Sequence, residues 1–130
     1  MKKNISISIS IILLSIIVSF IIFDSHDSKA NDPAISENIE IVDGTQYITI
    51  NARGGYSPKV SDAKASIPTK LIIKTDETYD CSISLVIRSI DYQKILEVTG
   101  EEIIDMNEPE VGQILGMCSM GMYNFTVNFN

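Results

Sequence analysis

The chain has 130 residues, a net charge of −7 and a single histidine, His26. Residues 31–130 contain 7 Lys and Arg residues against 15 Asp and Glu residues, and this acidic balance argues against nucleic acid as a partner, because nucleic acid needs a basic surface. Since His26 precedes the region that we expect to fold, no Ser-His-Asp or Cys-His arrangement can form there, and we predict no enzymatic activity.

The N-terminus carries the features of an export segment. Lys2 and Lys3 precede residues 5–23, an uncharged run of 19 residues dominated by Ile and Leu. A positive flank before an apolar run is typical of an export signal, and a run of this length also suffices to span a bilayer as a helix. Residues 28–30, Ser-Lys-Ala, offer a cleavage site. The first 30 residues are therefore predicted to be a signal peptide or, if uncleaved, a membrane anchor through residues 5–23. Either alternative leaves the remaining chain outside the membrane.

A short polar tether is expected to lead from this segment to one folded domain. The composition shifts to Ser, Asp, Asn and Lys after residue 23, with one Pro. Such a composition is typical of an irregular connection rather than of a helix or a strand. We place the tether at residues 31–42 and the domain at residues 43–130.

Within the domain, the hydrophobic pattern has the period of 2 that indicates strands. Apolar and polar residues alternate over residues 46–52 and 81–87, and residues 71–73 form a short apolar run. The last strand is the clearest, because its apolar residues share one face: Tyr123, Phe125, Val127 and Phe129. Several short strands separated by Gly and Pro turns predict an all-β sandwich or barrel. Residues 90–98 have an alternative interpretation as one or two helical turns.

Sulfur-containing side chains gather in the segment Gly116–Met122. It holds Cys118 together with Met117, Met120 and Met122. Thiolates and thioethers are soft ligands that favour Cu(I), whereas a structural zinc site would use Cys and His. A blue-copper site needs two histidines, and the domain has none, which argues against copper-based electron transfer.

Read in order, residues 45–129 resemble the small cupredoxin-like domains of exported bacterial and archaeal proteins, which are related to plastocyanin. The landmarks are Gly55-Tyr56-Ser57-Pro58, Lys64-Ala65, Pro68, Cys81, Gly112 and the closing Cys118-Ser119-Met120-Gly121-Met122. The resemblance implies a Greek-key β-sandwich preceded by the N-terminal apolar helix.

The chain departs from the family pattern at several positions. Ser66 and Ser119 stand where the family usually has Gly. Gly116 stands where an aromatic residue is common, and Phe125 where a Gly is common. We expect the gained ring to compensate for the lost one.

The same resemblance implies that Cys81 and Cys118 converge at one end of the sandwich. With Met120 and Met122 they would form an all-sulfur pocket suited to Cu(I). The favoured function is an extracytoplasmic copper-binding protein that transfers or sequesters Cu(I), with a copper transporter or another copper protein as its partner. One alternative is an exported binding or structural module with a Cys81–Cys118 disulfide and no metal. The other is a copper electron-transfer domain.

Overall fold

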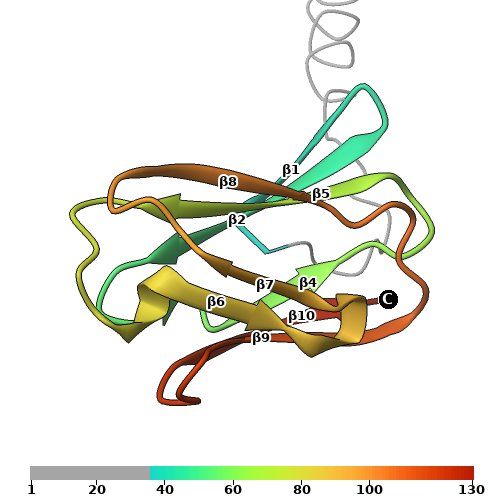
Figure 1. The fold of residues 1–130 in the computed structure, drawn as a ribbon. Coiled ribbons are helices and arrows are strands. Elements are labelled where there is room, and N and C mark those ends of the chain that lie inside the picture. The colour runs from blue at the N-terminus through green and yellow to red at the C-terminus, as the bar shows by residue number, and fades with distance from the viewer. Residues whose placement is uncertain (1–35) are drawn as a thin grey trace, which may run out of the picture. The chain divides into compact units, whose positions relative to one another are not determined.

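Residues 36–130 fold into a sandwich of two five-stranded β-sheets in the computed structural model (Figure 1), which describes only this part of the chain. The expectations for the apolar run, the cleavage site and His26 fall on residues outside the described part. Among residues 36–130, no helix is long and apolar enough to cross a membrane. The all-β architecture predicted from the sequence is confirmed.

The first sheet is built around a parallel pair of strands. Its order is β1 (Ile39–Val42), β2 (Thr45–Ala52), β5 (Thr69–Thr75) and β8 (Gly100–Asp105), and the short β3 (Tyr56–Ser57) pairs with β2. Strands β2 and β5 run parallel, whereas the other neighbours in this sheet are antiparallel.

The second sheet carries the C-terminal hairpin at its centre. Its order is β4 (Val60–Ala63), β10 (Asn124–Phe129), β9 (Gly112–Cys118), β6 (Ser84–Ile87) and β7 (Tyr92–Ile95). Strands β4 and β10 are parallel, and the other pairs are antiparallel. Each sheet is therefore mixed.

The core lies between the sheets and contains the apolar residues that the alternating pattern placed on one face. In β10, Phe125, Val127 and Phe129 are all buried, so the predicted register of the last strand is confirmed. The other strands contribute in the same way, with buried residues Ile48, Ile50, Leu71, Ile73, Leu85 and Ile87. Because side chains alternate between the faces of a strand, a shift by one residue would expose this whole set.

Three segments differ from the sequence expectations. The sheet begins inside the predicted tether, because β1 pairs with β2 before residue 43. The expected strand over residues 81–87 begins with a 3-10 turn, η1 (Cys81–Ile83), and only its second half is β6. Residues 90–98 hold the strand β7 at residues 92–95, after a second 3-10 turn, η2 (Arg88–Ile90), and the pairing of β7 with β6 replaces the further helical turn that the sequence allowed.

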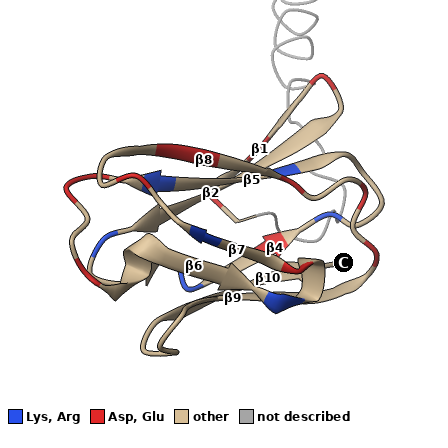
Figure 2. Cartoon of the chain, in the orientation of Figure 1, with Lys and Arg blue, Asp and Glu red and all other residues tan. Residues whose placement is uncertain are grey.

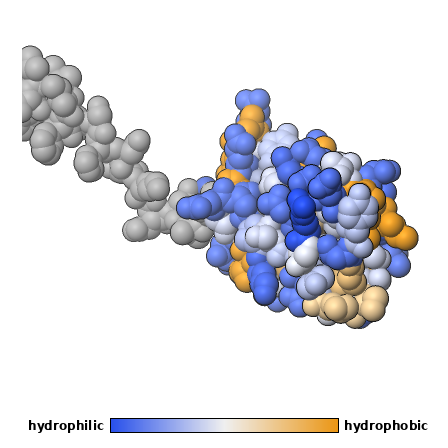
Figure 3. Space-filling view, turned by 90° about the vertical axis from the view of Figure 1, so that its left-hand side faces the viewer, coloured by the Kyte–Doolittle hydropathy of each residue, from blue (hydrophilic) through white to orange (hydrophobic). Residues whose placement is uncertain are grey.

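Charge is unevenly distributed over the sandwich. Residues 112–130, which form β9, β10 and their connecting loop, contain no Asp, Glu, Lys or Arg, and this hairpin is uniformly tan in Figure 2. The charged residues lie on the other strands and loops. The face drawn in Figure 3 is largely hydrophilic, with hydrophobic side chains in separate patches. The hairpin that carries Cys118 is thus a neutral part of an acidic domain.

Candidate metal centre

Cys81 occupies the first position of the 3-10 turn η1. The turn begins there because Asp80 caps it: Oδ1 of Asp80 accepts a hydrogen bond from the Ser82 backbone N–H at 2.9 Å. Such side-chain caps satisfy N–H groups that the start of a helical turn leaves without partners. Ser82 is buried, whereas Cys81 is only partly buried, so the turn is anchored in the protein with the cysteine near its surface.

Cys118 is the last residue of β9 and is fully buried. Its backbone N–H donates to the Tyr123 carbonyl at 3.0 Å, and its own carbonyl accepts from Gly121 N–H at 2.8 Å, so the two bonds close the loop after it. Gly121 has a φ of 71°, a left-handed conformation that glycine adopts without strain. The loop therefore folds back over the Cys118 sulfur, which accepts the Tyr123 N–H at 3.4 Å.

The thiols of Cys81 and Cys118 lie within hydrogen-bonding reach of each other, although the residues lie in separate segments. Both are free thiols, and the Cys81 thiol donates a hydrogen bond to Cys118. That bond, together with burial, raises the pKa of Cys81. For Cys118, burial opposes ionisation. The bond from Cys81 and the backbone N–H groups of Tyr123, Met122 and Met120 outweigh it, and the pKa of Cys118 is lowered. Cys118 is therefore the thiol that ionises first.

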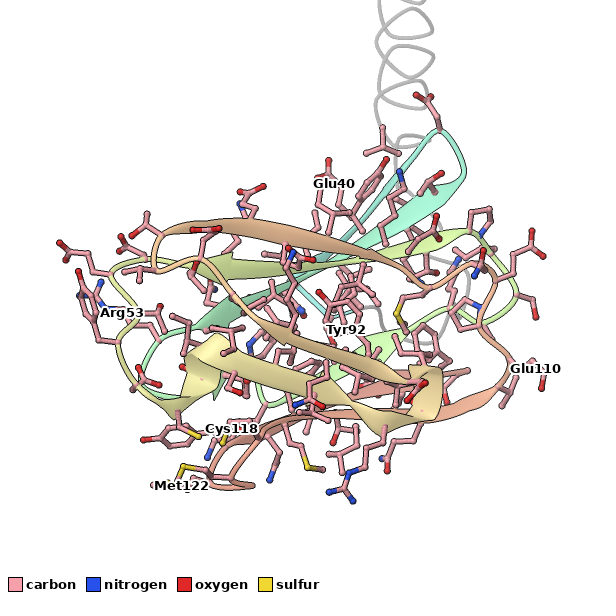
Figure 4. The ribbon with its side chains drawn as sticks, in the orientation of Figure 1. Glu40, Arg53, Tyr92, Glu110, Cys118 and Met122 are labelled. Carbon is pink, nitrogen blue, oxygen red and sulfur yellow. The ribbon has the colours of Figure 1, made fainter. Side chains whose placement is uncertain are left out.

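Met120 and Met122 are presented to solvent by the loop after Cys118. Their exposed fractions are 75% and 62%, which are large values for apolar side chains. Met122 also borders a hollow of about 170 Å³, whose other walls include Tyr56, Lys59 and Tyr123. Figure 4 shows Met122 and Cys118 at the same end of the sandwich. Both thioethers thus lie at the surface, on the loop that follows Cys118.

Tyr56 lies near both cysteines. Its hydroxyl donates to the Ser82 carbonyl at 2.9 Å, and its ring packs edge-on against Phe125 with the ring centroids 5.1 Å apart. Burial raises the pKa of Tyr56, and the neighbouring Cys118 and Cys81 charges raise it further. Tyr56 therefore stays protonated and acts as a hydrogen-bond donor.

Phe125 fills the space above Gly116. A Cβ atom at position 116 would lie 2.2 Å from two atoms of the Phe125 ring, and the two residues are direct neighbours across β9 and β10. This contact agrees with the expected compensation, because the ring gained at position 125 occupies the room that a side chain at position 116 would need.

The structure thus brings Cys81 and Cys118 together with the loop that bears Met120 and Met122. Within residues 36–130 no three His, Cys, Asp or Glu side chains gather in a way that could hold a metal, so thioethers would have to complete a site here. Met106 is buried in the core. The sequence reasoning missed Asp80, although Asp is one of the residue types preferred at the start of a helical turn.

Similarity to known proteins is found at the level of the fold. No protein-family model matches the chain, and no curated protein matches it significantly. The structure is similar to the metal-binding domain of CopA, the Cu(I)-exporting P-type ATPase of Streptococcus pneumoniae D39, in its crystal structure with Cu(I). The TM-score is 0.63 at 20% identity, covering 71% of this chain and 92% of that one.

It is also similar to the solution structure of a copper binding protein in the apo form. Here the TM-score is 0.64 at 20% identity, covering 71% of this chain and 94% of that one. At this level of identity the two comparisons establish a shared fold, and the fold is one found in copper-binding domains.

Proposed function

We propose that this protein binds copper as Cu(I), through the thiolates of Cys81 and Cys118 and the thioether of Met120 or Met122. The observation that carries the proposal is that two free thiols from separate segments lie within hydrogen-bonding reach of each other, beside a loop that presents two exposed thioethers. An all-sulfur set of this kind suits a soft monovalent ion. The two copper-binding domains of similar fold support the same metal class.

The sandwich itself is proposed to be of the cupredoxin-like Greek-key type. Support comes from its two mixed sheets, in which the parallel pairs β2–β5 and β4–β10 join strands from distant parts of the sequence. The closing motif Cys118-Ser119-Met120-Gly121-Met122 adds to this support.

The cellular role that we propose is extracytoplasmic transfer or sequestration of copper. It rests on the positive flank and apolar run at the N-terminus and on a site that exposes its thioethers. A copper transporter or another copper protein is the expected partner, since one similar domain belongs to a Cu(I)-exporting ATPase. No enzymatic activity is proposed.

Anaerobic loading of the reduced protein tests the proposal. We expect one Cu(I) per chain, measured by metal analysis after removal of weakly bound copper. Cys81→Ser and Cys118→Ser should each abolish tight binding. Met117→Leu is the matched control, because it removes a neighbouring sulfur that lies outside the proposed ligand set. If Cys118→Ser binds copper as well as the parent protein, the proposal is wrong.

The close approach of the sulfurs also supports the disulfide module as a second candidate. A free-thiol assay on protein taken from its native compartment distinguishes the two functions: two thiols and bound copper support the metal site, whereas no thiols and no copper support the disulfide. An intense visible absorption from a thiolate–Cu(II) bond in oxidised protein would instead favour the electron carrier.

A further inference from the structure

Asp80 makes more contacts than a cap requires. Its Oδ1 atom accepts hydrogen bonds from both the backbone N–H and the hydroxyl of Ser82, and these bonds cap the turn that begins at Cys81. Its Oδ2 atom accepts from the Gly54 N–H at 2.8 Å. The second contact has no capping function, because Gly54 lies in the turn between β2 and β3. Asp80 therefore ties the Cys81 turn to another part of the fold.

The β2–β3 turn also contacts the segment around Cys118. The backbone of Gly55 lies against the Tyr123 ring, since a Cβ at position 55 would be 3.4 Å from that ring. Tyr123 in turn donates its N–H to the Cys118 sulfur. On the other side, Tyr56 donates to the Ser82 carbonyl. A single turn thus touches both segments that carry a cysteine.

We propose that Asp80 is a positioning residue of the copper site. It binds no metal, because a carboxylate is a poor ligand for a soft ion. By joining the Cys81 turn to the β2–β3 turn, it holds the Cys81 sulfur next to Cys118. The copper ligation on which this role acts rests on the proposed function, whereas the placement of the two sulfurs does not.

Copper affinity gives the first test. Replacing a residue that orients a metal ligand typically lowers metal affinity by about 10- to 100-fold, and we expect a loss of that size for Asp80→Ala in competition with a coloured Cu(I) chelator. Asp80→Asn keeps an oxygen for the Ser82 cap but places an amide N–H₂ toward the Gly54 N–H, so its loss should be intermediate. The control is Glu77→Gln, which removes an equal charge three residues before Asp80; the Glu77 side chain forms an ion pair with Arg53.

The approach of the two thiols can be measured without copper. In the exchange with glutathione, the protein dithiol and one oxidised glutathione give the protein disulfide and two reduced glutathione molecules. The equilibrium reports the effective concentration of one thiol at the other. We expect this effective concentration to fall several-fold in metal-free full-length Asp80→Ala and to remain unchanged in Glu77→Gln. A residue that only stabilised the fold would leave this equilibrium, measured on the folded protein, unchanged.

The outcomes separate the two proposals. Loss of both copper affinity and dithiol closure in Asp80→Ala, but not in Glu77→Gln, supports the positioning role. If Asp80→Ala matches Glu77→Gln in both measurements, the role is refuted. If the parent protein binds no copper, but Asp80→Ala closes its disulfide less readily than the parent does, the copper site alone is refuted. Should Asp80→Ala fail to fold, Asp80→Asn decides, and affinity and closure equal to the parent's refute the role.

Discussion

Phe125 lies so close to Gly116 that the two positions can hold only one side chain between them. The ring is fully buried, and a Cβ on residue 116 would overlap it. The same ring supports Tyr56, which in turn holds the Ser82 carbonyl next to Cys81. The packing of β9 against β10 is therefore linked to the placement of a proposed ligand.

Gly116→Ala should accordingly destabilise the protein. Overpacking of a filled core costs about 1–3 kcal/mol, and the 2.2 Å approach places this variant at the upper end. Denaturant unfolding with a matched m-value measures the change. The double variant Gly116→Ala/Phe125→Leu should lose less than the sum of its single changes, because the smaller side chain vacates the space. Additive losses would contradict the shared-space interpretation.

The exposed methionines should share the role of the thioether ligand. Because either Met120 or Met122 can complete a site with two thiolates, each single change to Leu should have a small effect on Cu(I) affinity. Changing both to Leu should weaken Cu(I) binding by about tenfold or more. Replacing a residue that only orients a metal ligand already costs about that much, and losing the ligand itself should cost at least as much. Chelator competition measures the affinity, and Met106→Leu is the control from the core. An unchanged Cu(I) affinity in the double variant would show that neither Met120 nor Met122 is a copper ligand.

The thiol pair should titrate in two separate steps in the metal-free, reduced protein. The pKa of Cys118 is lowered and that of Cys81 is raised, so the ultraviolet absorbance of thiolate should first rise at a lower pH than that of an ordinary thiol. Cys118→Ser should abolish this early step. A first ionisation above the ordinary value would show that the backbone N–H groups do not stabilise the Cys118 thiolate.

The same shifts predict how stability depends on pH. A lowered folded-state pKa gives Cys118 a stabilising contribution that is complete above the unfolded-state value and is lost as the pH falls through the folded-state value. The raised pKa of Cys81 has the opposite sign, and its contribution is lost as the pH rises through its folded-state value. The difference in the free energy of unfolding between the parent protein and Cys118→Ser should therefore increase as the pH is raised from neutral toward about 8.5.

Glu102 joins the two sheets at their edge strands. Its carboxylate accepts the Tyr92 hydroxyl at 2.6 Å and Lys94 Nζ at 2.7 Å, and these bonds connect β8 to β7. The Lys94 and Tyr92 bonds lower the pKa of Glu102. Its contribution is therefore present above the ordinary glutamate value and is lost as the pH falls through the folded-state value.

Glu102→Gln should lower the free energy of unfolding by about 1 kcal/mol at neutral pH, because hydrogen bonds to a charged group are lost from a partly exposed position. The difference from the parent protein should shrink in acid. Glu101→Gln is the matched control, since its partner Lys74 lies on the same sheet and both side chains are about half exposed. An equal loss of unfolding free energy in the two variants would show that the link between the sheets stabilises the protein no more than an ion pair within one sheet.

The strands and their inward faces could be predicted because the alternating pattern is a local property. The register of β10, for example, follows from Phe125, Val127 and Phe129 alone. The start of β6 could not be predicted in this way, because the cap by Asp80 and the buried Ser82 replace the first part of the expected strand with a turn.

The site could be anticipated only in part for the same reason. Cys118, Met120 and Met122 are neighbours in sequence, but their pairing with Cys81 was implied by a family resemblance rather than by any spacing. The contact between Asp80 and Gly54 joins residues 26 positions apart, and no sequence pattern connects them. Tertiary contacts of this kind determine where Cys81 lies, and they become visible only in the folded chain.

The neutral hairpin of residues 112–130 has a consequence for the rate of metal exchange. An acidic domain repels anionic copper complexes and acidic partners over distances of about 8–10 Å at physiological salt. The segment that bears the thioethers adds no negative charge of its own to this repulsion. Encounters at the sulfur end should therefore be weakly sensitive to ionic strength, and short-range contact rather than long-range steering would select the partner.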